Sequence, residues 1–201
     1  MIVLACNSAS AQARDFLIHE GIVDEAALID VILPTVRYIA TTSHQHIGVI
    51  GTRATVSSHA YRDHILTDAP LRIVREHACP LFVPFIEEQA THTRAYALLV
   101  RASLAPFRHS PCDALVLGCT HYPLITPLIK KNLPQRTVII HPGIAVAREL
   151  ATRVAPSSES PTTISWYTTD EARRFETKAH LFWGEPISAQ HVSIDTLDGH
   201  G

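Results

Sequence analysis

Two cysteines of this sequence stand in the same local setting and could act together on a proton. The segment 2–8, Ile-Val-Leu-Ala-Cys-Asn-Ser, aligns without gaps with the segment 115–121, Leu-Val-Leu-Gly-Cys-Thr-His. If Cys6 and Cys119 face each other across a site, one thiolate can remove a proton from one face of a carbon while the other thiol returns a proton to the opposite face. An isolated cysteine is more often a small buried hydrophobe, but the repeated setting favours a functional pair.

The residues around each cysteine predict an apolar strand followed by the start of a helix. Residues 114–117 have the continuous hydrophobicity of a parallel strand that is covered on both faces. Gly118 permits a close turn, and Pro123 suits the first turn of a helix. Cys119 is therefore expected at the carboxyl end of a strand, where open α/β sheets bind their ligands. The positive end of the helix dipole is expected to lower the pKa of a thiol in this position.

Strands and helices are expected to alternate along the chain, which indicates an α/β fold with mainly parallel sheets. The expected strands cover residues 2–5, 47–50, 81–83, 115–117, 137–140 and 164–167. The segment 51–55, Gly-Thr-Arg-Ala-Thr, is expected to open a helix, and its N–H groups and its hydroxyls, those of Thr52 and Thr55, could bind a carboxylate. Ordinary capping of that helix by Thr52 is the alternative, and the sequence favours neither.

Composition narrows the class of protein and of cofactor. A chain of 201 residues with 46% hydrophobic residues and a mean hydropathy of +0.11 suits one domain or two small lobes with a hydrophobic core. The net charge of −2 predicts no nucleic-acid partner, and no apolar run reaches the roughly 18–20 residues of a membrane span. No signal peptide is recognisable at Met1, so a cytoplasmic protein with reduced thiols is expected. No glycine-rich phosphate loop or C-x-x-C pair occurs, and His44 and His46 lack an evident third ligand, so neither a nucleotide nor a metal cofactor is expected.

Four segments resemble the glutamate racemase family, in the family's order and at close to its spacing. They are residues 5–10 (Ala-Cys-Asn-Ser-Ala-Ser), 47–55, 79–87 and 118–124 (Gly-Cys-Thr-His-Tyr-Pro-Leu). The stretch from Trp166 to Phe175 is also similar to the family's closing strand and helix. The resemblance implies two similar lobes, each with mainly parallel sheets flanked by helices and with the active site between them. Residues 1–30 and 141–201 would form the first lobe and residues 31–140 the second.

The same resemblance implies a chemistry and assigns roles to individual residues. It implies interconversion of L- and D-glutamate without a cofactor, with Cys6 and Cys119 as the two catalytic thiols. Asn7, Ser8, Thr120 and His121 correspond to positions that hold the substrate. His121 is also suited to tune the protonation of Cys119, and Glu87 corresponds to a family acid near that thiol. Glutamate is then the small-molecule partner and D-glutamate for peptidoglycan the product, while the sequence leaves a homodimer open.

The sequence departs from the family pattern before the first cysteine. Family members carry an upstream strand with an Asp-Ser-Gly motif and then a further strand, whereas only five residues precede Cys6. The first lobe is therefore expected to be incomplete at its N-terminus, and Cys6 to lack an assisting acid. Two alternatives to an active glutamate racemase stay open. One is an inactive racemase-like binding module, and the other is a racemase of the same superfamily that acts on aspartate or hydantoins.

Overall fold

The computed structural model describes residues 1–154 and 163–194 of the chain. The chain divides into two compact units, Met1–Ala155 and Pro156–Gly201, which are described separately here. The larger unit contains a four-stranded sheet, a two-stranded sheet and the helices that cover them. Within the described ranges, none of the helices is both long enough and apolar enough to cross a bilayer.

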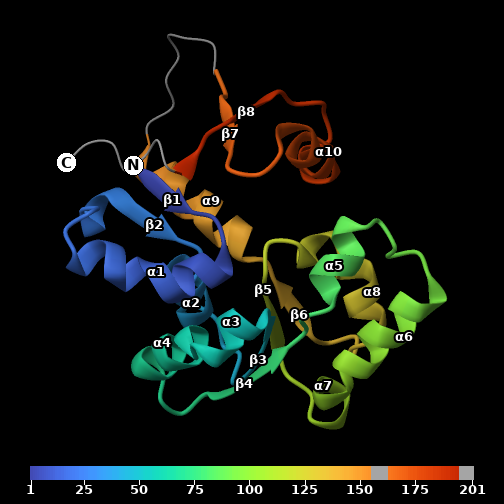
Figure 1. Ribbon diagram of the computed structural model, residues 1–201. Helices are drawn as coiled ribbons and strands as arrows, with labels where there is room; N and C mark the ends of the chain where they lie inside the picture. The colour runs from blue at the N-terminus through green and yellow to red at the C-terminus, as the bar shows by residue number, and fades with distance from the viewer. Residues whose placement is uncertain (155–162, 195–201) are drawn as a thin grey trace. The chain divides into compact units, whose positions relative to one another are not determined.

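The main sheet consists of four parallel strands in the order β4-β3-β5-β6 (Figure 1). The strands are β3 (His46–Gly51), β4 (Ile73–Ala78), β5 (Ala114–Gly118) and β6 (Val138–Ile140). Parallel neighbours need a crossover connection, and helices provide it between each pair of consecutive strands. Every residue of β5 is buried, as expected for a central strand that is covered on both faces.

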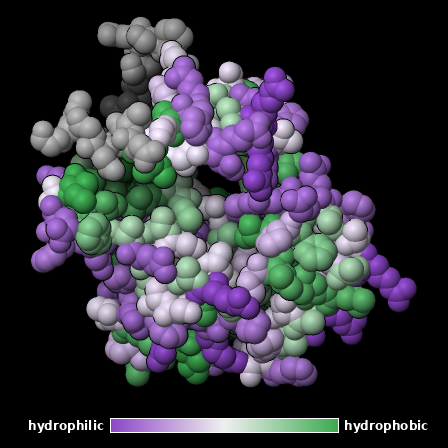
Figure 2. All heavy atoms as spheres, viewed as in Figure 1, coloured by the Kyte–Doolittle hydropathy of each residue, from purple (hydrophilic) through white to green (hydrophobic). Residues whose placement is uncertain are grey.

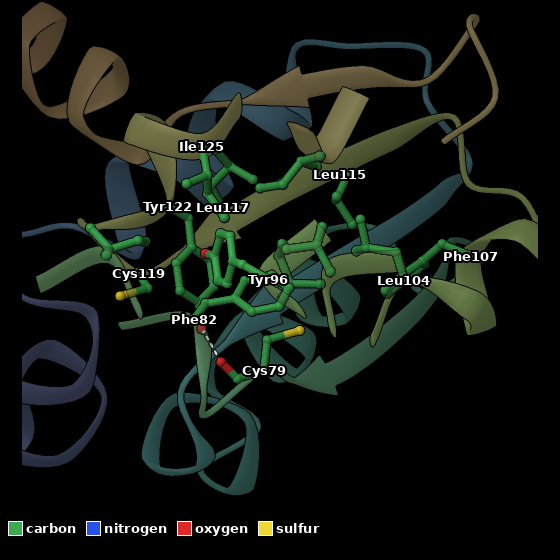
Figure 3. Packing of buried hydrophobic residues seen from close by; sticks show 14 of the residues in the cluster. Cys79, Phe82, Tyr96, Leu104, Phe107, Leu115, Leu117, Cys119, Tyr122 and Ile125 are labelled. Carbon is green, nitrogen blue, oxygen red and sulfur yellow. Dashed lines mark hydrogen bonds between the residues drawn. The ribbon is translucent and has the colours of Figure 1, made fainter. Parts of the chain in front are cut away.

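Side chains of the central strands alternate between two hydrophobic layers. Leu115 and Leu117 of β5 pack in one cluster, and Ala114 and Val116 pack in the other. Figure 3 shows the first cluster, in which aromatic rings lie against the sheet. That layer comes from α5 (Phe82–Glu87), α6 (Arg94–Ser103), α7 (Ala105–His109), the 3-10 helix η2 (Tyr122–Ile125) and α8 (Thr126–Lys131). The second layer comes from α2 (Leu33–Ala40), α4 (Ala60–Asp68) and α9 (Pro142–Arg153), while α3 (Arg53–Ser57) follows β3 directly.

A small parallel sheet at the start of the chain consists of β1 (Ile2–Leu4) and β2 (Leu28–Asp30). They are joined by α1 (Asn7–His19) and the 3-10 helix η1 (Glu25–Ala27). A two-stranded sheet is marginal by itself, and this one depends on β2, whose Ile29 joins the second hydrophobic layer. The side chain of Ile2 in β1 stays 47% exposed, and Figure 2 shows hydrophobic surface near this end of the chain.

The smaller unit contains β7 (Trp166–Thr168), α10 (Ala172–Trp183) and β8 (Ala189–His191). The two strands pair in parallel, so α10 is the crossover between them. The rings of Trp166 and Trp183 meet edge to face with their centroids 5.2 Å apart. Gly184 ends α10 with a φ of 82°, a conformation that glycine adopts without a steric penalty.

The structure confirms the α/β class with parallel sheets and corrects one expected strand. Residues 81–83 do not form a strand, because Phe82 begins α5 and packs with Ile86, one turn later, into the first layer. Pro84 is tolerated there because the first turn of a helix does not need its N–H. The actual strand is β4, and it is hard to recognise because an edge strand can carry polar residues, here Arg75, Glu76 and His77.

Gly118 is predicted to be needed for the pairing of β5 with β3. A Cβ at Gly118 would lie 2.8 Å from the carbonyl oxygen of Ile50. Movement of the Ile50 backbone away from this Cβ would disturb the hydrogen bonds of a central strand and therefore costs free energy. We expect Gly118→Ala to lower the free energy of unfolding by about 1–3 kcal/mol, the usual cost of overpacking. Urea titration followed by circular dichroism measures this change.

Gly143→Ala is the matched control for this prediction. Gly143 lies in α9, and a Cβ added there meets nothing within 4 Å. Alanine at a compatible position stabilises by about 0.4–1 kcal/mol because it restricts the unfolded chain. Equal effects of the two substitutions would show that the contact between β3 and β5 at Gly118 is not the constraint described here.

Candidate active site

The register of the two central strands brings two polar segments to one edge of the main sheet. β3 and β5 are paired so that Gly51 lies opposite Gly118. Thr52 and Cys119 directly follow these glycines, so both come at the carboxyl edge of the sheet. Open α/β sheets bind their ligands at this edge.

Cys119 is a buried thiol whose pKa is raised to about 11. Its side chain belongs to the same hydrophobic cluster as the rings of Phe82 and Tyr122 (Figure 3), and loss of solvent is the largest cause of the shift. Negative charge on Cys6 and Glu87 raises the pKa further, while the main-chain N–H groups of His121 and Tyr122 favour the thiolate and offset part of the effect.

The expectation that a helix dipole lowers the pKa of Cys119 is therefore wrong. The segment after Cys119 is not one regular helix but the short 3-10 helix η2, followed by the six-residue helix α8. Such short elements provide little aligned dipole, so only the nearest N–H groups act on the sulfur. Burial against the aromatic layer outweighs them.

His121 connects the Cys119 thiol to a carboxylate. The Nδ1 atom of His121 lies 3.9 Å from Sγ of Cys119, and its Nε2 atom lies 3.1 Å from Oε1 of Glu87. Glu87 is the last residue of α5 and is brought here by the packing of that helix in the first layer. A carboxylate that accepts the Nε2 proton leaves Nδ1 of a neutral imidazole as a proton acceptor toward the thiol.

Cys6 lies at the N-cap of α1 and is exposed. Its carbonyl oxygen accepts the first helical bond, from the N–H of Ser10 at 2.8 Å, while its side chain makes no capping bond. Cys6 is near enough to Cys119 for its charge to act on the pKa of that thiol. The two cysteines thus belong to one electrostatic environment although 112 residues separate them in the sequence.

Asn7 is tied to the main sheet by a buried hydrogen bond. Its side chain is 2% exposed, and its Oδ1 atom accepts a hydrogen bond of 2.7 Å from the hydroxyl of Tyr61 in α4. Tyr61 is fully buried, and burial raises the pKa of its hydroxyl. The Nδ2 atom of Asn7 has no hydrogen-bond partner among the described residues. A buried donor without a partner costs free energy, which a bound ligand that accepts its proton would recover.

Ser8 continues this connection through hydroxyl groups. Its Oγ atom lies 2.8 Å from Oγ1 of Thr52 and 3.4 Å from Oγ1 of Thr55. Thr52 also caps α3, because its Oγ1 atom accepts the N–H of Thr55 at 3.2 Å. Thr120, the residue between Cys119 and His121, is exposed.

Tyr61 is a part of this arrangement that no sequence pattern indicates. Both Tyr61 and Thr55, a residue of the 51–55 segment, are fully buried, and each contacts a polar side chain of α1. No sequence signal separates Tyr61 from an ordinary core tyrosine, because its partner Asn7 lies 54 residues away. Cys79 and Cys112 are buried as well, and burial raises the pKa of each thiol, to about 12 and about 11.

The chain matches a family of known proteins over most of its length. Residues 1–150 match the model of the Asp/Glu/Hydantoin racemase family. The glutamate racemase of Lactiplantibacillus plantarum is 34% identical over 209 residues, which cover 96% of this chain and 73% of that protein. The glutamate racemase of Shouchella clausii is 36% identical over 209 residues, which cover 99% of this chain and 72% of that protein.

Solved structures give the same relationship. The glutamate racemase of Bacillus anthracis superposes with a TM-score of 0.87 at 31% identity, over 96% of this chain and 73% of that one. A glutamate racemase from Francisella tularensis, solved in complex with D-glutamate, also reaches a TM-score of 0.87, at 30% identity over 97% of this chain and 74% of its own.

The two cysteines of the site are predicted to differ in reactivity toward iodoacetamide. Only a thiolate is alkylated quickly, so buried Cys119, with a pKa of about 11, should react much more slowly at pH 7.5 than exposed Cys6. The rate at Cys119 should then rise about tenfold per pH unit up to pH 10, as the thiolate fraction does. Mass spectrometry of tryptic peptides after timed quenching measures both rates. Rapid labelling of Cys119 at pH 7.5 would contradict the assignment of a raised pKa.

Removal of the Tyr61 hydroxyl is predicted to destabilise the protein. Tyr61→Phe leaves the buried Oδ1 atom of Asn7 without its donor, so the free energy of unfolding should fall by about 1–3 kcal/mol. Tyr38→Phe is the control, because its ring stays over the guanidinium of Arg148 and the change should stay within about 0.5 kcal/mol. Urea titration compares them, and an equal effect of the two changes would refute a structural role for the Tyr61 bond.

Proposed function

Because the chain belongs to the glutamate racemase family of the aspartate/glutamate racemase superfamily, we propose that it interconverts L- and D-glutamate by proton transfer between two cysteines. The observation that carries the proposal is the electrostatic coupling of Cys6 and Cys119, which follow two strands of like sequence. The contacts of Asn7 and Ser8 with Tyr61 and Thr52 support the proposal, because they connect the segment that follows Cys6 to the elements around the main sheet.

At Cys119 the proposed reaction begins with the formation of the thiolate. With a pKa of about 11, this thiol is protonated at neutral pH. The Nδ1 atom of His121 is in reach of the thiol proton, and the resulting imidazolium is stabilised by Glu87 through Nε2. Transfer of the proton to His121 therefore makes Cys119 a base even though the pKa of its thiol is high.

The proton transfer itself uses both faces of the α-carbon. The Cys119 thiolate takes the α-proton of one enantiomer, and the bonding electron pair stays on the carbon as a carbanion. The Cys6 thiol then gives its proton to the opposite face, which yields the other enantiomer and leaves Cys6 as the thiolate. The reverse reaction exchanges the two roles, and solvent and His121 restore the starting protonation.

The polar groups around the two thiols are suited to hold the carboxylates and the amino group of glutamate. Asn7 supplies the unpartnered Nδ2 donor, and Ser8, Thr52 and Thr120 supply hydroxyls. His121 adds a further donor when it is protonated. Donors held in fixed positions also stabilise the carbanion, because they need no reorganisation when the charge forms.

The proposal includes a division of the chain into two lobes and a cellular role. Residues 1–30 with 141–201 would form the first lobe and residues 31–140 the second, with Cys6 and Cys119 on opposite lobes. The product D-glutamate would supply peptidoglycan synthesis in the cytoplasm. This role is inferred from the family.

The reaction is tested by incubating the purified protein with L- or D-glutamate in deuterated water. Chiral chromatography should detect the other enantiomer, and proton NMR should detect loss of the α-hydrogen signal. Cys6→Ala and Cys119→Ala should each lower the rate by about 10²–10⁴-fold, the usual contribution of a general acid or base. Cys112→Ala, which removes a buried thiol outside the proposed site, should leave the rate within a few-fold.

Other outcomes decide between the remaining functions. Exchange with aspartate or a hydantoin but not with glutamate would assign a different substrate within the superfamily. A folded protein that binds glutamate without exchanging its α-hydrogen would be a binding module. Unchanged activity of both cysteine variants would exclude the two-thiol mechanism.

A further inference from the structure

A surface hollow of about 430 Å³ lies where three helices of the main unit end. Its lining consists of Arg101 in the last turn of α6, Arg108 in α7, Lys131 in α8 and the following residues Asn132, Leu133 and Pro134. We call this feature the basic hollow. None of its residues belongs to the candidate active site, so it is a separate feature of the fold.

The segment that builds the basic hollow is strongly cationic in a chain that is acidic overall. Residues 89–148 contain seven Lys and Arg residues and one acidic residue, Asp113, whereas the whole chain has a net charge of −2. Asp113 is engaged elsewhere, because its carboxylate accepts the main-chain N–H groups of Gln45 and His46. Positive charge is thus concentrated in one stretch of sequence, and the fold gathers part of it around one hollow.

Within the part of the chain that the structure describes, the three cations of the basic hollow have no acidic partner. No ion pair between described residues involves Arg101, Arg108 or Lys131. The guanidinium of Arg108 instead donates to the main-chain carbonyl oxygen of Arg101, which holds the Arg108 side chain against the C-terminal part of α6. Like charges that converge without a counter-charge repel one another, and a bound anion would relieve that repulsion.

Neutralisation of helix dipoles is the alternative explanation for these cations. Each one lies in the last turn of its helix, where a positive charge is favourable. However, α7 and α8 have only five and six residues, so their dipoles are small. This explanation also gives no reason for an open hollow that has an amide donor, Asn132, and an apolar wall, Leu133 and Pro134.

We propose that the basic hollow binds a small organic diphosphate. Its three cations match the roughly three negative charges of a diphosphate ester, and a guanidinium can bind phosphate oxygens through two parallel hydrogen bonds. The volume of about 430 Å³ lies within the range of roughly 300–1,000 Å³ for small-molecule sites. Leu133 and Pro134 provide the contact for the organic part.

The test is isothermal titration of the full chain with ADP and with inorganic pyrophosphate, at constant ionic strength set with chloride. Both probes should bind, and ADP should bind more tightly because its organic part can contact the apolar wall. Arg108→Gln or Lys131→Gln should weaken the binding of each probe at least about tenfold, as expected for loss of a charge-assisted hydrogen bond. Arg94→Gln is the matched control: this arginine is exposed at the opposite end of α6 and should leave the affinity unchanged.

Three results would overturn the proposal. If the folded protein binds neither probe, and neither probe changes its melting curve, neutralisation of the helix dipoles is left as the role of the cations. Equal loss of affinity in Arg94→Gln would show diffuse charge attraction rather than a site. Tighter binding of a single-stranded RNA oligonucleotide than of ADP would assign a nucleic-acid surface instead. If the glutamine variants do not fold, Arg108→Lys replaces them in the titration, because it keeps the charge but removes the paired donors of the guanidinium.

Discussion

The close parallel pairing of β3 with β5 is the constraint on which the rest of the site depends. The backbones approach so closely at Gly51 and Gly118 that a Cβ at Gly118 would contact the Ile50 carbonyl. This register brings the ends of both strands to the same level, so Thr52 and Cys119 begin at one edge of the sheet. The buried layers on both faces fix the strands in that register, because a slip by one residue would turn every apolar side chain to the wrong face.

A second group of contacts joins the start of the chain to this edge. Asn7 and Ser8, at the beginning of α1, bond to Tyr61 and to the threonine hydroxyls of α3. The small sheet of β1 and β2 buries little of β1, so these polar contacts and the packing of Ile29 account for how Cys6 is held near Cys119. A site built in this way is sensitive to single buried hydrogen bonds, because each unsatisfied group in it is costly.

The electrostatics of Cys119 represent a balance between burial and nearby polar groups. The aromatic layer that stabilises β5 also removes solvent from the thiol and raises its pKa to about 11, while two main-chain N–H groups act in the opposite direction. In the proposed reaction, His121 accepts the proton of the Cys119 thiol and Glu87 stabilises the resulting imidazolium, so a low pKa of the thiol is not required. Three helices of the aromatic layer, α6, α7 and α8, carry the cations of the basic hollow in their last turns, and no ion pair between described residues involves these cations.

The sequence alone determined the α/β class, the parallel strands around the two cysteines and the family, because these depend on local hydrophobic patterns and short motifs around Cys6 and Cys119. It also indicated the helix start at Thr52, which is a local hydrogen bond. Only the tertiary structure decided that residues 81–83 are helical, that Cys119 has a raised pKa and that Tyr61 supports Asn7. Each of these results depends on residues far apart in the chain: burial and long-range hydrogen bonds arise only when the layers pack, and no local pattern records them.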